Sequence, residues 1–201
     1  MNIIEQGTII HYHQHRQESF GDDDVQTLGW KNLQSQQKRF DIIAELVDFN
    51  NTSVLDAGCG KGDFLRFLLQ RSNAVRYIGI DLNPDFVAYA NEQFCSCQQS
   101  RFYQADFSVA ALPLVDHVVL SGALSYRTKD PVYWKKIISR LFSNSRRSLV
   151  FNFLSDKTFP EHPLLVSYSV DEVIDFCQSI CRQLDIRSGY IDHDTTLCLH
   201  W

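Results

Sequence analysis

The sequence lacks a long apolar run and a surplus of positive charge. No stretch approaches the ~20 apolar residues that a membrane-spanning helix needs. The first ten residues, MNIIEQGTII, contain no basic region followed by an apolar core. We therefore expect a cytoplasmic protein without a membrane partner. Acidic residues outnumber basic ones by 24 to 19, for a net charge of -5, so nothing indicates a general attraction to nucleic-acid phosphates.

The sequence also lacks a convincing metal-binding pattern. It has six cysteines, but without a secretory signal we expect them to be reduced thiols. Cys95 and Cys97 form a C-x-C pair with no second ligand pair at the spacing of a structural zinc site. His11, His13 and His15 alternate along a candidate strand, and three histidines on one face of an extended segment rarely converge on one ion. We expect a solvated N-terminal arm and no metal.

A glycine-rich turn follows an apolar segment in VLDAGCGKG, residues 54–62, and precedes the helical pattern DFLRFLL. Gly58 permits a tight turn, and Gly60 lets the backbone approach a ligand where a Cβ atom would collide with it. The amide groups at the start of the next helix then face that ligand. Dinucleotide-binding turns have a third small residue for helix packing, and here that position is Asp63. The pattern therefore disfavours NAD and indicates S-adenosylmethionine.

Strand and helix patterns alternate along the rest of the chain, which predicts a parallel sheet with helices on both faces. The last two β-rich runs are separated only by Asp192, His193 and Asp194. This connection is too short for a crossover, so the two runs must pair antiparallel and the last strand is reversed. The turn between them should then lie on the ligand side of the sheet. The predicted strands are residues 53–58, 77–81, 101–106, 117–122, 148–154, 184–191 and 195–201.

Capping signals predict where several helices begin. Asn83 precedes a proline at the start of one apolar stripe, and Asp130 with Pro131 precedes another. Ser169 and Glu172 have the spacing of a capping box for a helix that should reach about residue 182.

Together these motifs resemble class I S-adenosylmethionine-dependent methyltransferases, from Gln36 to the C-terminus. DAGCG (56–60) is similar to the first motif of that family, YIGIDLNP (77–84) to the second and FYQADF (102–107) to the third. The resemblance implies a single Rossmann-like, doubly wound seven-stranded sheet, with an antiparallel C-terminal strand. It also implies a donor site with the methionine part at Asp56, Gly58, Cys59 and Gly60, the ribose at Asp81, the adenine at Asp106, Leu82 and Phe107, and the pocket floor at Ser121 and Gly122.

The same glycines also suit an ordinary strand-to-helix turn, and the same aspartates suit helix caps. Three such signatures in the right order at three strand ends favour a shared site. The segment after the fourth strand reads SGAL, without the Asn-Pro-Pro-Tyr pattern of relatives that modify adenine amines. Base amines are therefore disfavoured as acceptors.

Three further residues are candidates for the acceptor side. His193 lies in the predicted hairpin turn and has the chemistry of a general base. Tyr126 follows the fourth strand and can position an acceptor or face the sulfonium by cation–π attraction. Asn152 lies near the end of the fifth strand and can reach an acceptor. Each also has a plain structural role, as a turn residue, as loop packing or as a partner of backbone groups.

Residues 1–35 form no complete domain, and we expect an extension or lid over a methyltransferase domain at residues 36–201. Trp30, Gln36, Arg39 and Phe40 are similar to a Trp-x5-Gln-x2-Arg-Phe pattern of small bacterial methyltransferases. That resemblance implies that Trp30 walls an acceptor pocket and that Arg39 pairs with the carboxylate of the cofactor. The alternative is a helix that packs on the sheet through Phe40 and Ile43, with Arg39 in water.

The sequence therefore predicts a monomeric or homodimeric enzyme that transfers a methyl group from S-adenosylmethionine to a small molecule and releases S-adenosylhomocysteine. Three alternatives stay open. They are an RNA or protein methyltransferase, a non-catalytic protein that binds the cofactor, and an aminopropyl transferase of the same fold.

Overall fold

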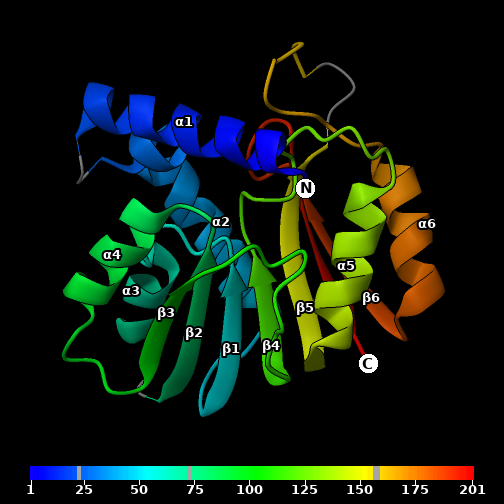
Figure 1. Ribbon diagram of the computed structural model, residues 1–201. Helices are drawn as coiled ribbons and strands as arrows, with labels where there is room; N and C mark the ends of the chain where they lie inside the picture. Colours follow the sequence, from blue (N-terminus) through cyan, green and yellow to red (C-terminus); the bar gives the residue numbers. More distant parts are fainter. Residues whose placement is uncertain (22–23, 72–73, 156–158) are drawn as a thin grey trace.

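The computed structural model describes residues 1–21, 24–71, 74–155 and 159–201. Its centre is a seven-stranded sheet in the order β3-β2-β1-β4-β5-β7-β6 (Figure 1). Neighbouring strands from β3 to β5 are parallel, whereas β7 runs antiparallel to both β5 and β6. The predicted Rossmann-like fold with a reversed last strand is confirmed. The strands are β1 (Thr52–Ala57), β2 (Val75–Asp81), β3 (Ser100–Gln104), β4 (Val115–Leu120), β5 (Ser145–Leu154), β6 (Gln183–Ser188) and β7 (Asp194–His200).

Helices cover both faces of the sheet, as the alternating pattern predicts. Apolar side chains of α2 (Leu33–Leu46), α3 (Asp63–Leu69) and α4 (Pro84–Gln93) pack into one core, and those of α5 (Tyr133–Ser143) and α6 (Val170–Ile180) pack into the other. The central strands are buried on both sides, which accounts for their continuous apolar runs. Because the strands from β3 to β5 are parallel, their carboxyl ends lie together at one edge of the sheet. Asp56, Asp81 and the residues after β4 lie at this edge.

The N-terminal segment differs from its prediction. Residues 3–20 form the helix α1 (Ile3–Phe20), where a candidate strand and a solvated arm were expected. Asn2 accepts hydrogen bonds from the first turn and Glu5 binds back to the backbone of Asn2, which is a complete capping box. In Figure 1, α1 crosses above the carboxyl ends of the strands. A short 3-10 helix, η1 (Val25–Leu28), leads from there to α2. The alternation of the three histidines was therefore misleading, because His13 is buried in a helix.

Of the three other predicted helix starts, those of α4 and α6 are confirmed and that of α5 needs correction. Asn83 caps α4 through its side chain, as predicted. Helix α5 begins at Tyr133 and not at Asp130, because the Asp130 carboxylate accepts the backbone N–H of Val132 in a turn before the helix. Helix α6 follows Ser169, but the serine side chain makes no capping hydrogen bond, and the helix ends at Ile180.

Over residues 1–21, 24–71, 74–155 and 159–201, no helix combines the length and the apolar character needed to cross a membrane. Within the same ranges, no group of three or more histidine, cysteine or acidic side chains could hold a metal ion.

Candidate functional site

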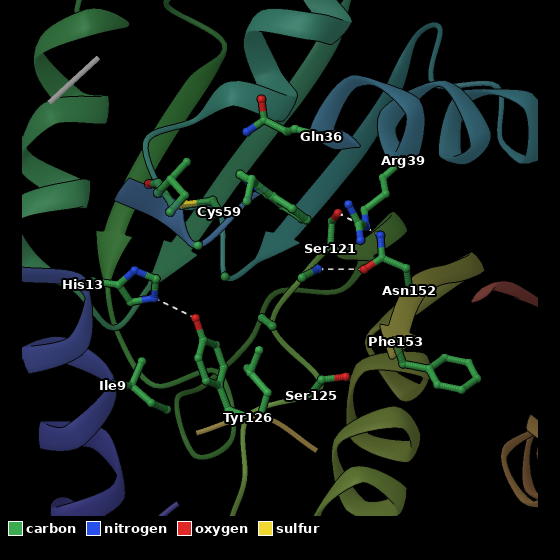
Figure 2. Close-up of a pocket in the computed structure, with 18 of the residues that line it drawn as sticks. Ile9, His13, Gln36, Arg39, Cys59, Ser121, Ser125, Tyr126, Asn152 and Phe153 are labelled. Carbon is green, nitrogen blue, oxygen red and sulfur yellow. Dashed lines mark hydrogen bonds between the residues drawn. The ribbon is translucent and has the colours of Figure 1, made fainter. Parts of the chain in front are cut away.

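A cavity of about 480 Å³ lies at the carboxyl ends of the parallel strands, beneath α1. Its volume is within the range of roughly 300 to 1,000 Å³ that is usual for small-molecule sites. Every residue that the sequence singled out for the site lies on its wall: Trp30, Arg39, Asp56, Gly58, Cys59, Gly60, Asp81, Leu82, Asp106, Phe107, Ser121, Gly122, Tyr126, Asn152 and His193. Figure 2 shows several of them together with side chains of α1 and α2.

The first part of the wall, which we call the glycine-turn half, consists of Asp56, Gly58, Gly60, Asp81 and Asp106. Gly58 and Gly60 have φ values of 77° and 53°, which side chains rarely adopt. A Cβ atom on Gly58 would lie 2.7 Å from the Cβ atom of Ala123, so the turn and the segment after β4 fit together only with glycine there. A Cβ atom on Gly60 would lie 2.9 Å from a methyl group of Leu28, in η1.

Asp81 joins the glycine turn to the end of β2. One oxygen of its carboxylate accepts the N–H of Gly60 at 2.8 Å, and the other accepts the N–H of Asn83 at 2.8 Å. Burial raises the pKa of Asp81, and these backbone N–H groups oppose that rise. A carboxylate has about four acceptor positions, so two remain for hydroxyl groups of a ligand.

Asp106 lies at the other end of the glycine-turn half and binds the N-terminal helix. One of its oxygens accepts the side-chain amide of Gln6 at 2.8 Å, and the other accepts the N–H of Ser108 at 2.7 Å. The ammonium group of Met1 donates to the Ser108 hydroxyl at 3.4 Å. The start of α1 is therefore fixed to the same strand end that the sequence assigns to adenine.

Asp56 is buried, and its carboxylate accepts the hydroxyl hydrogen of Tyr77. Burial raises the pKa of Asp56 to about 7, and the bond from Tyr77 opposes that rise. Cys59 is also buried, and its Sγ atom lies over Gly79, where a Cβ atom would approach to 2.8 Å. Both residues therefore hold the glycine turn against β2.

The second part of the wall, which we call the hairpin half, consists of Trp30, Arg39, Tyr126, Asn152 and His193. Asn152 is buried; its amide oxygen accepts the N–H of Gly122 at 2.8 Å, and its amide nitrogen donates to Ser121 at 3.0 Å (Figure 2). This is the backbone-satisfying role that the sequence left open. The indole of Trp30 lies over Gly122, where a Cβ atom would come within 2.6 Å.

Arg39 forms an ion pair with Asp194, the first residue of β7, and its guanidinium lies 4.9 Å from the ring centre of Trp30. The alternative is confirmed in part, since Phe40 and Ile43 of α2 are buried in the core, but its placement of Arg39 in water is wrong, because that side chain is 12% exposed. Burial raises the pKa of Asp194 to about 6, and the charge of Arg39 opposes that rise. Helix α2 and the C-terminal hairpin are thus joined at the cavity.

His193 lies in the turn between β6 and β7, on the ligand side of the sheet as predicted. Its φ of 61° is left-handed, and its ring meets Phe159 edge to face at 6.0 Å.

Sequence reasoning missed the roles of His13, which lies on the wall, and of Gln6, which donates to Asp106. Both come from α1, whose cap was readable as Asn2 followed three residues later by Glu5. His13 is buried against Phe86 and hydrogen-bonded to Tyr126, as Figure 2 shows.

Part of the chain is similar to known methyltransferases. Residues 55–146 match the protein family described as Methyltransferase domain. A tRNA (guanine-N(7)-)-methyltransferase of Clostridium botulinum is 39% identical over 41 residues, which are 20% of this chain and 19% of that protein. A malonyl-(acyl-carrier protein) O-methyltransferase of Pectobacterium atrosepticum is 35% identical over 78 residues, 39% of this chain and 28% of that protein. The chain thus matches under a third of the length of either relative.

Solved structures resemble the whole fold. The magnesium protoporphyrin IX methyltransferase of Synechocystis PCC 6803, crystallised with bound SAH (S-adenosylhomocysteine), superposes on this chain with a TM-score of 0.71 at 16% identity. The superposition covers 98% of both chains. Residues 55–146 therefore match a methyltransferase domain, and the chain as a whole has the fold of class I S-adenosylmethionine-dependent methyltransferases.

Proposed function

We propose that this protein transfers a methyl group from S-adenosylmethionine to a small-molecule acceptor. The observation that carries the proposal is the convergence of the glycine turn, Asp81 and Asp106 on one cavity, whose opposite wall is the hairpin half. The cavity fits the donor because the glycines expose backbone at one strand end and two further strand ends present carboxylates. When bound, the donor supplies a methyl group on a positively charged sulfur.

In this proposal the glycine-turn half holds the donor, together with Arg39 of the hairpin half. Asp81 accepts the ribose hydroxyls with its remaining lone pairs, and Asp106 accepts the adenine amine beside Gln6. Arg39 has donors beyond those that bind Asp194 and the Ser35 carbonyl, and these suit the carboxylate of the donor. The methionine part lies at Asp56, Gly58, Cys59 and Gly60, the adenine ring packs on Leu82 and Phe107, and Ser121 and Gly122 form the floor.

The hairpin half holds the acceptor, with Trp30, Tyr126, Asn152 and His193 on its wall. The protein positions the acceptor atom in line with the methyl group, about 3 to 3.5 Å away, and this alignment supplies much of the rate. Residues 1–35 act as a lid, because α1, η1 and Trp30 roof the cavity. A small acceptor suits a site roofed by the chain's own helix in a protein of net charge -5.

An RNA acceptor is the second candidate, and the match to a tRNA methyltransferase over 41 residues is the observation that favours it. The two candidates separate in one experiment. The purified protein is incubated with methyl-labelled donor and a cell extract, which is then divided into small molecules, RNA and protein. We expect label in the small molecules. Label in RNA or protein alone would overturn the proposed acceptor class, and donor binding without any label would indicate a non-catalytic binder.

A substitution of His193 tests the role of this residue separately. His193→Gly removes the imidazole and suits the left-handed turn, so the hairpin should keep its shape. If His193 contacts the acceptor, transfer to small molecules slows while the affinity for S-adenosylhomocysteine is unchanged. Unchanged transfer would leave His193 as a turn residue only.

A further inference from the structure

A buried histidine of the N-terminal helix and a tyrosine of the cavity wall form a hydrogen-bonded pair. Nδ1 of His13 lies 2.9 Å from the carbonyl oxygen of Thr27, and Nε2 lies 2.6 Å from the hydroxyl of Tyr126. A carbonyl can only accept, so Nδ1 must carry a proton. In the neutral imidazole, Nε2 is then bare and accepts the tyrosine hydrogen. The geometry therefore fixes both the tautomer of His13 and the direction of the bond.

The backbone around Tyr126 is held firmly at the cavity wall. Tyr126 forms a β-bridge with Leu165. The carbonyl of the preceding Ser125 accepts the N–H of Val166 at 2.9 Å, and the Ser125 hydroxyl accepts the N–H of Leu154 at 3.0 Å. His13 approaches from α1 on the other side (Figure 2), and both rings line the cavity. A hydroxyl that donates its one hydrogen keeps lone pairs, and those of Tyr126 can accept from a bound molecule.

The surroundings of the pair keep both members neutral. Burial lowers the pKa of His13, the bond to Thr27 opposes this, and the charges of Arg16 and Lys61 lower it further. Burial raises the pKa of Tyr126, as do Asp81 and Tyr12, while Arg16 opposes the rise. At neutral pH the pair therefore consists of a phenol that keeps its proton and an imidazole able to take one.

We propose, on the basis of the proposed function, that Tyr126 contacts the acceptor atom and that His13 takes the acceptor's proton through Tyr126. The acceptor is then a hydroxyl, thiol or amine that must lose a proton, and not a carboxylate, which needs no base. Tyr126 is the catalytic residue of the pair, and His13 is a positioning residue that acts through it. This assigns a chemical role to the histidine of α1 and identifies the class of acceptor.

The step balances with groups of the protein. The Tyr126 oxygen takes the acceptor's proton as its own proton moves to Nε2 of His13. Meanwhile the acceptor's electron pair forms the bond to the methyl carbon, and the sulfur–methyl bond breaks with its electrons left on sulfur. His13 then carries a proton on each nitrogen and returns one to solvent. No oxidant, reductant or metal is required.

The first test examines the pair in the free protein, without any assay of activity. Nitrogen-15 NMR of labelled histidine should show His13 neutral at neutral pH, with its proton on Nδ1. The Nε2 resonance should move in Tyr126→Phe, because the donor to that atom is lost. A proton on Nε2, or a doubly protonated His13 at neutral pH, would overturn the proposal.

The second test measures transfer of labelled methyl groups to the small-molecule fraction by four proteins: wild type, His13→Gln, Tyr126→Phe and the control His11→Gln. His11 is exposed on the same helix. A glutamine at position 13 offers an oxygen to the Tyr126 hydroxyl but cannot take a proton. We expect at least about a tenfold loss of rate in His13→Gln and Tyr126→Phe, an unchanged affinity for S-adenosylhomocysteine, and wild-type behaviour in His11→Gln.

The pH profile and the product separate this proposal from its rivals. The wild-type rate should fall as acid protonates His13, whereas the rate of His13→Gln should not show this fall. If the acid fall disappears in His193→Gly and not in His13→Gln, the proposal is wrong.

Mild alkali releases labelled methanol from methyl esters but not from methyl ethers, thioethers or amines. Label that survives alkali supports the proposal, and label released by alkali overturns it while leaving the proposed function intact. An unlabelled small-molecule fraction would contradict the proposed function itself.

Discussion

The two halves of the cavity are built in different ways. The glycine-turn half comes from consecutive strand ends, and its carboxylates accept backbone N–H groups from those same ends, as in the bond from Gly60 to Asp81. The hairpin half is assembled from distant parts of the chain, as in the pairing of Arg39 with Asp194 and of His13 with Tyr126. The comparison indicates that recognition of the donor depends mainly on local, rigid groups, with Gln6 and Arg39 added from elsewhere in the chain, whereas recognition of the acceptor depends on how the N-terminal segment docks.

The largest expected effect concerns two buried carboxylates, Asp56 of the glycine-turn half and Asp194, which pairs with Arg39 of the hairpin half. Burial raises the pKa of Asp56 to about 7, and its partner is the neutral Tyr77, whereas Asp194 has the charged Arg39 as partner and a pKa of about 6. A raised carboxyl pKa gives stability that is complete below the pKa of the unfolded chain and is lost as pH rises through the folded value.

Asp56→Asn keeps an acceptor for the Tyr77 hydroxyl and should remove the loss of stability that wild type shows as pH rises. Relative to wild type, its free energy of unfolding should rise by about 4 kcal/mol between about pH 4 and pH 8, a shift of about three units at about 1.4 kcal/mol each. Urea unfolding across that range measures it, with the exposed Asp171→Asn as control. Equal pH slopes in wild type and Asp56→Asn would mean that the carboxylate is not desolvated.

Gly58→Ala is the next largest change and tests the rigidity of the glycine-turn half. The added Cβ atom would lie 2.7 Å from that of Ala123, so the turn must move. We expect the affinity for S-adenosylhomocysteine to fall about a hundredfold, or about 3 kcal/mol, by calorimetry. Gly189→Ala is the matched control, because Gly189 has a φ of 74° and open space around it. Equal affinities in both variants would show that the turn does not hold the donor.

Local features of the chain explain why the sequence was sufficient to predict the residues of the glycine-turn half. A glycine at positive φ, a capping Asn83 and an acidic residue at a strand end are each set by neighbours in the chain. The burial of His13 depends instead on a hydroxyl 113 residues away, and no local pattern carries that information. The position of Arg39 likewise depends on the start of β7. The reversed direction of β7 was predictable because a short hairpin allows only antiparallel pairing.

Asp81→Ala should have a smaller effect than Gly58→Ala. It removes the acceptor of the Gly60 N–H and the proposed partner of the ribose hydroxyls. We expect at least a tenfold loss of affinity for S-adenosylhomocysteine, or about 1.4 kcal/mol, in the same calorimetric titration. Asp81→Asn keeps one acceptor oxygen and should lose less. An unchanged affinity in Asp81→Ala would refute the ribose assignment.

The smallest effect tests the docking of the N-terminal helix. Gly7 is exposed in α1, and an added Cβ atom meets nothing within 4 Å. Gly7→Ala should stabilise the helix by about 0.5 to 1 kcal/mol. If α1 unfolds separately from the sheet, hydrogen exchange will slow in α1 and stay unchanged in the β-strands. A uniform change over both would show that the helix and the sheet unfold as one unit, and the proposed distinction between the two halves would be wrong.

The most direct test of the account is a calorimetric titration of the purified protein with S-adenosylhomocysteine, followed by the same titration with NAD. Three strand ends around one cavity predict saturable binding of S-adenosylhomocysteine at one site per chain and no binding of NAD. Binding of NAD without any heat from S-adenosylhomocysteine would contradict the assignment of this cavity to a sulfonium donor.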